Sequence, residues 1–172
     1  MVAKFITFVC TILILLNQSA AFADGRNIIW RFNNKTKITE IESSSAKISV
    51  SAGESSEQHA LQVCFQTDTF WPSVAFNLKS AEDWSSYSYL SIKILNTEVK
   101  AVSVGFAIRD AFGKIYKPVR VLSPKKWLEI KLPIKAMSLG TDMGWSGEAV
   151  NIKQIDNITF FLHKPKKIVL IF

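Results

Sequence analysis

Hydrophobic and polar residues alternate along most of the chain beyond Arg26, with a period of two residues rather than 3.6. A period of two is the pattern of a β-strand, because successive side chains of a strand point to opposite faces of its sheet. Segments of this kind, rich in Ile, Val, Phe and Tyr, are residues 27–32, 46–51, 59–66, 73–78, 89–96, 101–110, 114–122, 127–132, 156–163 and 167–172. About ten short strands separated by polar breaks predict an all-β sandwich or barrel. Helical patterns are confined to a turn at 55–58 and a short helix at 135–138.

Within each strand, the alternation predicts which side chains face the core. The predicted core comprises Leu90, Ile92, Ile94, Val102, Val104, Phe106, Ile108, Val119, Val121, Leu128, Ile130, Leu132, Ile158, Phe160 and Leu162. Trp84, in a D-W-S-S-Y sequence just before a strand, is predicted to close the core at a corner. Cys64 is the only cysteine beyond residue 23, so this core has to hold the fold without an internal disulfide.

The first 23 residues have the composition of an export signal. Lys4 gives a positively charged start, residues 5–16 form an uncharged apolar run, and Ala21-Phe22-Ala23 is a small-x-small cleavage sequence. The run is shorter than the roughly 20 residues that span a bilayer, and a permanent anchor helix is the alternative. We therefore expect cleavage after Ala23, a secreted or periplasmic protein without membrane attachment, and a single domain over residues 24–172.

The composition is basic, with 21 Lys and Arg against 14 Asp and Glu and a formal net charge of +7. Scattered lysines are a common way to keep the edges of a sheet soluble. A positive charge also attracts an anionic partner, such as a sulfated or uronate-rich glycan, and both interpretations stay open. A nucleic-acid partner is not expected, because the sequence has no nucleic-acid-binding motif.

Patterns for catalysis and metal binding are weak. The two histidines, His59 and His163, stand in no Ser-His-Asp order, and Cys64 lies in an apolar strand where a buried, unreactive thiol is expected. The 172-residue chain is too short for a (β/α)₈ barrel, which needs about 200 residues or more. No cofactor is predicted, and a structural calcium at isolated turn carboxylates is left open. The enzyme alternative is a small β-sandwich lyase or hydrolase that uses Glu129, Asp110 or Tyr116.

The outward-facing side chains mix aromatic rings with planar hydrogen-bonding groups, at Tyr89, Arg109, Tyr116, Trp127, Glu129, Phe161 and His163. Sugars present apolar C–H faces and hydroxyl groups, so a saccharide site combines stacking rings with polar partners. Trp71, before a proline, and Trp145, in a glycine-bearing loop, are predicted to be exposed stacking platforms. Alternatively, neighbouring strands belong to different sheets and these residues share no surface. The predicted carbohydrate-binding residues are Arg109, Tyr116, Trp127, Trp145 and His163.

Several short motifs follow one another from residue 70 onward. They are F-W-P-S-V-A-F at 70–76, D-W-S-S-Y at 83–87, L-S-I-K-I-L-N at 90–96, I-R-D at 108–110 with Gly113, I-D-N-I at 155–158 and F-L-H-K-P at 161–165. Their order, over about 100 residues, resembles the N-terminal carbohydrate-binding-like domain of agarases of glycoside hydrolase family 50. It is similar, more distantly, to galactose-binding-like jelly rolls such as carbohydrate-binding module family 11.

The resemblance implies a non-catalytic jelly-roll accessory domain of a polysaccharide-degrading enzyme. In that family a catalytic barrel with both acidic residues follows this domain, whereas this sequence ends at Phe172. Related modules also tend to have an acidic residue after the last strand, near a structural calcium, and that residue is missing here. We therefore expect binding of a polysaccharide, for instance an agar-like galactan. The alternatives are a structural domain that partners a separate glycoside hydrolase chain, and the small enzyme described above.

Overall fold

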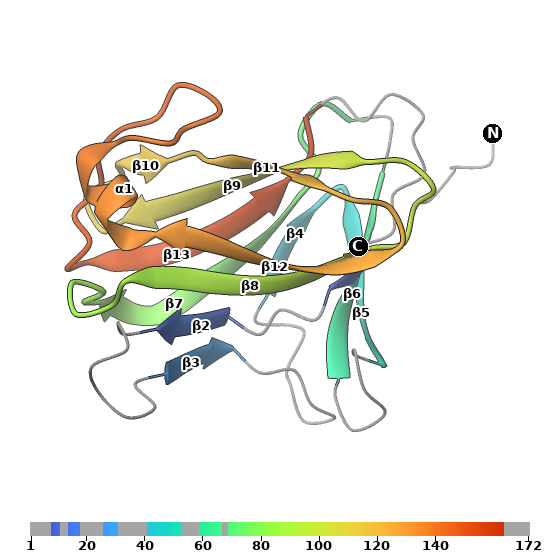
Figure 1. Cartoon of the computed structure of the whole chain (residues 1–172), viewed down its shortest axis with the longest axis horizontal. Helices are drawn as coiled ribbons and strands as arrows, with labels where there is room; N and C mark the ends of the chain where they lie inside the picture. Colours follow the sequence, from blue (N-terminus) through green and yellow to red (C-terminus); the bar gives the residue numbers. More distant parts are fainter. Residues whose placement is uncertain are drawn as a thin grey trace.

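The computed structural model describes residues 8–10, 14–17, 26–30, 41–52, 59–66 and 69–163. They form two antiparallel β-sheets and one short helix (Figure 1). The β-sandwich predicted from the alternation is confirmed. No helix among these residues is both long and apolar enough to cross a membrane.

One sheet has seven strands. They are β1 (Phe8–Cys10), β2 (Ile14–Asn17), β3 (Arg26–Trp30), β5 (Ala46–Ala52), β6 (His59–Phe65), β8 (Tyr89–Asn96) and β12 (Lys126–Pro133). Their order is β3-β2-β8-β1-β6-β5, and β12 pairs with β8 along its whole length. Two of these strands, β1 and β2, lie within the predicted signal peptide. The cleavage sequence itself is outside the described residues, so cleavage after Ala23 stays a prediction, and it would remove both strands from the sheet.

The other sheet has six strands. They are β4 (Ile41–Ser44), β7 (Ser73–Glu82), β9 (Val102–Asp110), β10 (Ile115–Tyr116), β11 (Val119–Leu122) and β13 (Ile155–Phe161). Their order is β10-β9-β13-β7-β4, and β11 pairs with β9 beyond β10. The strands β10 and β11 therefore form one edge of this sheet. The helix α1 (Ile134–Leu139) lies at the same end of the sandwich as β10 (Figure 1), which confirms the short helix predicted there.

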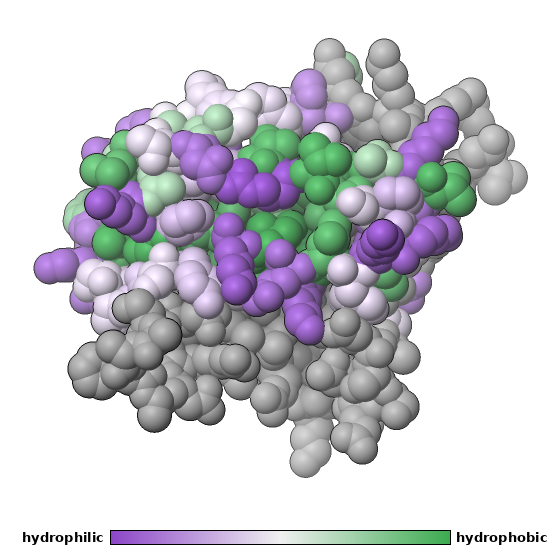
Figure 2. All heavy atoms as spheres, in the orientation of Figure 1, coloured by the Kyte–Doolittle hydropathy of each residue, from purple (hydrophilic) through white to green (hydrophobic). Residues whose placement is uncertain are grey.

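The core lies between the two sheets, as the alternation predicts. Leu90, Ile92 and Ile94 of β8 are buried, and so are the alternating residues Val102 to Ile108 of β9. Trp84 is fully buried, which confirms its predicted place in the core. Outside the core the pattern is mixed: on the face shown in Figure 2, hydrophobic and hydrophilic side chains are interleaved.

The predicted strand at 114–122 is wrong in detail. It is split into β10 and β11 at Lys117-Pro118, because proline has no N–H to donate to the ladder. The break changes which side of the sheet the following residues face. Val121, predicted in the core, is 65% exposed, whereas Leu122 is fully buried.

One further strand differs from the prediction, and two predicted segments are not tested by the structure. The edge strand β4 was not expected, because only Ile41 of its four residues is buried and the others give no alternation. The predicted turn at 55–58 and the predicted strand at 167–172 lie outside the described residues.

Candidate functional site

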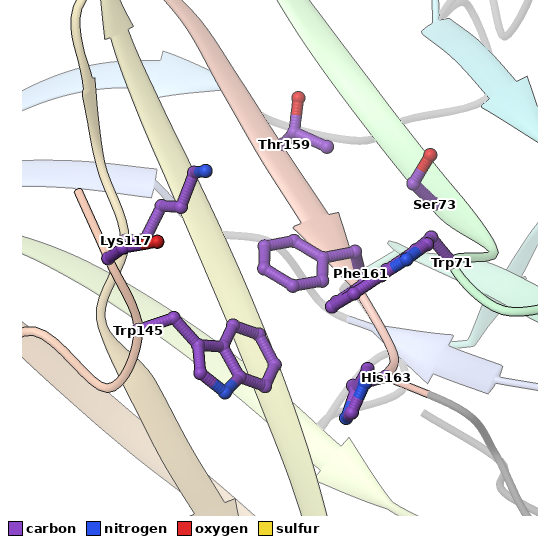
Figure 3. A pocket seen from close by; sticks show the side chains of 8 residues that line it. Trp71, Ser73, Lys117, Trp145, Thr159, Phe161 and His163 are labelled. Carbon is purple, nitrogen blue, oxygen red and sulfur yellow. The ribbon is translucent and has the colours of Figure 1, made fainter.

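A pocket of about 620 Å³ opens on the outer face of the six-stranded sheet. Its lining combines four rings with hydroxyl groups and one ammonium group (Figure 3): Trp71, Ser73, Lys117, Trp145, Ser146, Thr159, Phe161 and His163. We call this the aromatic pocket. Its volume lies within the range of about 300 to 1,000 Å³ that is typical of small-ligand sites.

The four rings of the aromatic pocket pack against one another. The Trp71 ring centre lies 4.4 Å from that of His163, with the two planes tilted by 34°. Trp145 lies 5.2 Å from Phe161 and 5.5 Å from Trp71, edge-on to the latter. Trp71 nevertheless stays 50% exposed, and His163 is exposed as well. The cluster therefore presents aromatic faces to solvent while its own ring contacts hold them in place.

Two of these rings are positioned by the ends of β7 and β13. Phe161 is the last residue of β13 and pairs with Ser73 of β7 on one side and Gly105 of β9 on the other. Trp71 is fixed by the buried Pro72 that follows it, whose carbonyl oxygen accepts a hydrogen bond from the Leu162 N–H at 3.1 Å. The F-W-P-S segment thus brings Trp71 beside the end of β13.

Gly105 makes room for the rings on the sheet surface. A Cβ atom at this position would lie 2.4 Å from Cζ of Phe161 and 2.8 Å from Cζ3 of Trp145. Both distances are far below van der Waals contact, so any side chain here would displace the two rings. A glycine in a strand often marks such a close approach.

Trp145 reaches the pocket from the loop 140–154, which backbone hydrogen bonds hold against the sheet edge. The Gly144 N–H donates to the Lys117 carbonyl at 3.1 Å, and the Glu148 N–H donates to the Ile115 carbonyl at 2.9 Å. Gly144 also has to be a glycine, since a Cβ atom would lie 2.4 Å from Cγ2 of Val119. The Trp145 side chain is therefore carried by a backbone that is fixed on both sides.

Tyr116 was predicted to bind carbohydrate from the outer face, but its side chain is fully buried. Its hydroxyl donates to the main-chain oxygen of Asp142 at 3.3 Å. Arg120 forms an ion pair with the Asp142 carboxylate, so both residues anchor the loop that carries Trp145. The alternation does not determine which face Tyr116 occupies, because the Lys117-Pro118 break leaves it in a two-residue strand.

Tyr116→Phe is expected to make the loss of stability at alkaline pH shallower. Burial raises the pKa of Tyr116 from 10.0 to about 12, and the Asp142 carboxylate adds to the rise. The phenol therefore contributes stability that is complete below pH 10 and is lost as the pH rises toward 12. Melting temperatures of both proteins between pH 8 and 12 measure this, and the wild-type curve should fall more steeply. Parallel curves would contradict the assignment.

Cross-strand pairing arranges the outward-facing residues of β9, β13 and β7 in three rows. The rows are Gly105-Phe161-Ser73, Ala107-Thr159-Ala75 and Arg109-Asn157-Asn77. The middle row has only small side chains, so the surface is low between an aromatic row and a polar row. Phe161 and Asn157 are four residues apart on one strand, which corresponds to about 13 Å. The outer sheet face therefore continues from the aromatic pocket, across the small side chains of the middle row, to the polar row Arg109-Asn157-Asn77, which we call the polar wall.

A chain of hydrogen bonds across three strands runs through the polar wall. The Thr159 hydroxyl, in the pocket lining, donates to Oδ1 of Asn157 at 2.8 Å. Nδ2 of Asn157 donates to Oδ1 of Asn77 at 2.7 Å, and Nδ2 of Asn77 donates to Oε1 of Glu42 at 2.7 Å. The orientation of each amide is thus determined by its neighbour.

The structure brings together only part of the predicted carbohydrate-binding set. Trp145 and His163 line the aromatic pocket, and Arg109 lies on the same sheet face, where Nε contacts Asp156 Oδ1 at 3.0 Å. Trp127 belongs to β12 of the other sheet, so the five residues do not form one surface. The binding role of these residues stays a prediction.

The residues of the enzyme alternative are not assembled into a site. The carboxylate of Asp110 is buried and accepts backbone N–H groups of Phe112, Lys114 and Asn151 at 2.8–3.0 Å. Glu129 lies on β12 of the other sheet and accepts the Ser91 hydroxyl at 2.6 Å. Among the described residues, no three His, Cys, Asp or Glu side chains come together as a metal site.

Sequence reasoning missed part of the pocket lining. Lys117, Ser73, Ser146 and Thr159 were not singled out. The position of Thr159 two residues before Phe161 was a usable signal, because residues two apart on a strand share a face. No local pattern marks Lys117, which reaches the pocket only because the loop 140–154 packs beside it.

The fold is similar to a part of several agarases of known structure. The chain superposes on an exo-β-agarase with a TM-score of 0.66 at 12% identity, over 78% of this chain and 23% of the agarase. The agarase AgWH50C gives a TM-score of 0.62 at 14% identity, over 78% and 22% of the two chains. For PfGH50B the TM-score is 0.58 at 19% identity, over 72% and 20%.

These matches concern the fold and a limited part of each agarase. No protein-family model matches the sequence, and no curated protein is similar to it in sequence. The chain spans about a fifth of the length of the agarases. The resemblance to a domain of family 50 agarases, first predicted from the order of short motifs, is thereby confirmed as a shared fold.

Proposed function

We propose that this β-sandwich binds a polysaccharide without cleaving it. The observation that carries the proposal is the aromatic pocket, with Trp71 and Trp145 placed by fixed backbone segments at one end of a low sheet surface. Exposed indole faces stack on the C–H faces of pyranose rings. The hydroxyl groups of Ser73, Ser146 and Thr159 are suited to hydrogen bonds with sugar hydroxyls.

The polar wall extends this site in the direction of a second sugar unit. Asn157 is buried, and it holds the half-buried Asn77 amide in place by a hydrogen bond at 2.7 Å, so binding at Asn77 would order few additional side chains. A surface of this length suits a chain of several sugar units better than a single monosaccharide. The similarity to parts of agarases supports a galactan as the first polymer to test.

The test is affinity electrophoresis of the purified protein in native gels that contain agarose, carrageenan, alginate or β-glucan. We expect retardation by at least one polymer, and no new reducing ends in the same mixtures. Unchanged migration with every polymer would contradict the proposal. New reducing ends that disappear in Glu129→Gln would instead support the enzyme alternative.

A second candidate is a domain that partners a separate glycoside hydrolase chain. The fold covers only about a fifth of each agarase, so the matching part of the agarase belongs to a longer polypeptide. This favours a domain that works beside a catalytic chain. Trp127 on the opposite sheet, pairing with Leu95 of β8, offers a half-buried ring for such a contact. Co-purification with a catalytic chain that is lost in Trp127→Ala would support it.

A further inference from the structure

We infer that the sugar unit held in the aromatic pocket carries a negative charge, a sulfate ester or a carboxylate, which pairs with the Lys117 ammonium group. This inference rests on the proposed function and narrows it to a class of polysaccharide. It follows from the position of Lys117 and from the charge balance of the outer sheet face.

Lys117 has a fixed backbone and a side chain directed over the pocket. It follows β10 at the sheet edge and is half-buried. Its carbonyl oxygen accepts the Gly144 N–H at 3.1 Å, so the same hydrogen bond positions both Lys117 and the loop that carries Trp145. Figure 3 shows the Lys117 side chain extending from this edge toward Phe161 and Thr159.

The charges around the pocket are unbalanced. Lys117 is the only Lys, Arg, Asp or Glu among the eight lining residues, and no residue in the described part of the chain forms an ion pair or hydrogen bond with its ammonium group. Two other charged pairs on this side of the sandwich are formed between protein side chains. Arg109 contacts Asp156 at 3.0 Å, and Arg120 pairs with Asp142.

An unpaired ammonium group beside aromatic rings favours an anionic ligand. The rings displace water, so the effective dielectric constant is lower than at an open surface and an ion pair gains more energy there. A charged hydrogen bond to sulfate or carboxylate is about twice as strong as a neutral one. The formal net charge of +7 adds a general attraction toward an anionic polymer. A neutral sugar would use the rings and hydroxyl groups but not this charge.

The experiment compares polymers that share a backbone and differ in charge. Binding of the full chain is measured by isothermal titration calorimetry with carrageenan and its desulfated form, and with polygalacturonate and its fully methyl-esterified form. We expect at least tenfold tighter binding of one charged polymer than of its neutral counterpart at low salt, with the preference reduced at high salt. Preference within the first pair identifies a sulfate ester, and preference within the second identifies a carboxylate.

Variants assign the preference to Lys117. Lys117→Met should abolish the ratio of charged to neutral binding, whereas Lys117→Arg should retain it. Lys114→Met is the matched control, because Lys114 is an exposed lysine in the turn before β10. The ratio within each variant is independent of the fraction of folded protein. Equal wild-type affinity for both members of each pair would overturn this inference but leave the proposed function standing. A full preference in Lys117→Met would also overturn it. Failure to bind any of these polymers, together with unchanged migration in all the affinity gels, would overturn both proposals.

Discussion

Trp145→Ala is expected to weaken polysaccharide binding at least about tenfold while the protein stays folded. Trp145 lies 5.2 to 5.5 Å from Phe161, His163 and Trp71, so its loss opens one wall of the aromatic pocket. Losing an aromatic side chain at the centre of a binding site costs about 2 kcal/mol or more, and each 1.4 kcal/mol corresponds to a factor of ten in Kd. The backbone bonds of Gly144 and Glu148 do not depend on the indole, so the loop should remain in place.

Trp127→Ala is the matched control for this result. The same atoms are removed, but Trp127 lies on β12 in the other sheet and pairs with Leu95 of β8. Affinity gels with the polymer that retards wild-type protein should show faster migration for Trp145→Ala and unchanged retardation for Trp127→Ala. The opposite order would place the binding surface on the seven-stranded sheet, around Trp127.

Much of the fold can be predicted from the sequence because burial on one side of a sheet leaves a strict alternation. Leu90, Ile92 and Ile94 illustrate this, since a shift of one residue would expose all three. The alternation fails where a strand is short or interrupted. Tyr116 and Val121 flank a proline break, and their faces depend on the tertiary arrangement rather than on the local pattern.

The candidate site is harder to predict, because it depends on contacts between distant residues. Trp127 and Trp145 look equally suitable in the sequence, yet strand pairing places them on different sheets. Gly105 lies 40 positions before Trp145, and its role is visible only from the ring atoms that a Cβ would meet. Lys117 likewise has no ion-pair or hydrogen-bond partner among the residues that the structure describes, and no spacing rule predicts this.

The second large effect concerns stability: Trp84→Ala is expected to lower the melting temperature by roughly 6 to 20 °C. Truncating a buried Trp or Phe to Ala costs about 3–5 kcal/mol, and each kcal/mol corresponds to about 2–4 °C in a domain of 150 or more residues. Trp84 is fully buried, and its indole Nε1–H donates to Glu82 Oε2 at 3.1 Å. The substitution therefore leaves both a cavity and a carboxylate without this donor.

Trp84 also links the core to the loop that carries Trp145. Its backbone N–H donates to the Ile152 carbonyl at 2.7 Å, at the far end of the loop 140–154. Trp71→Ala is the control, because the same truncation at a side chain that is 50% exposed leaves no cavity and should change the melting temperature by only about 2 °C. Thermal unfolding followed by circular dichroism separates the two, and equal melting temperatures would contradict the core assignment.

Below its melting transition, Trp84→Ala should still bind polysaccharide, since no ring of the aromatic pocket is removed, whereas Trp71→Ala should melt normally and bind weakly. The two variants thus distinguish Trp84, which stabilises the fold, from Trp71, which is expected to contact the sugar.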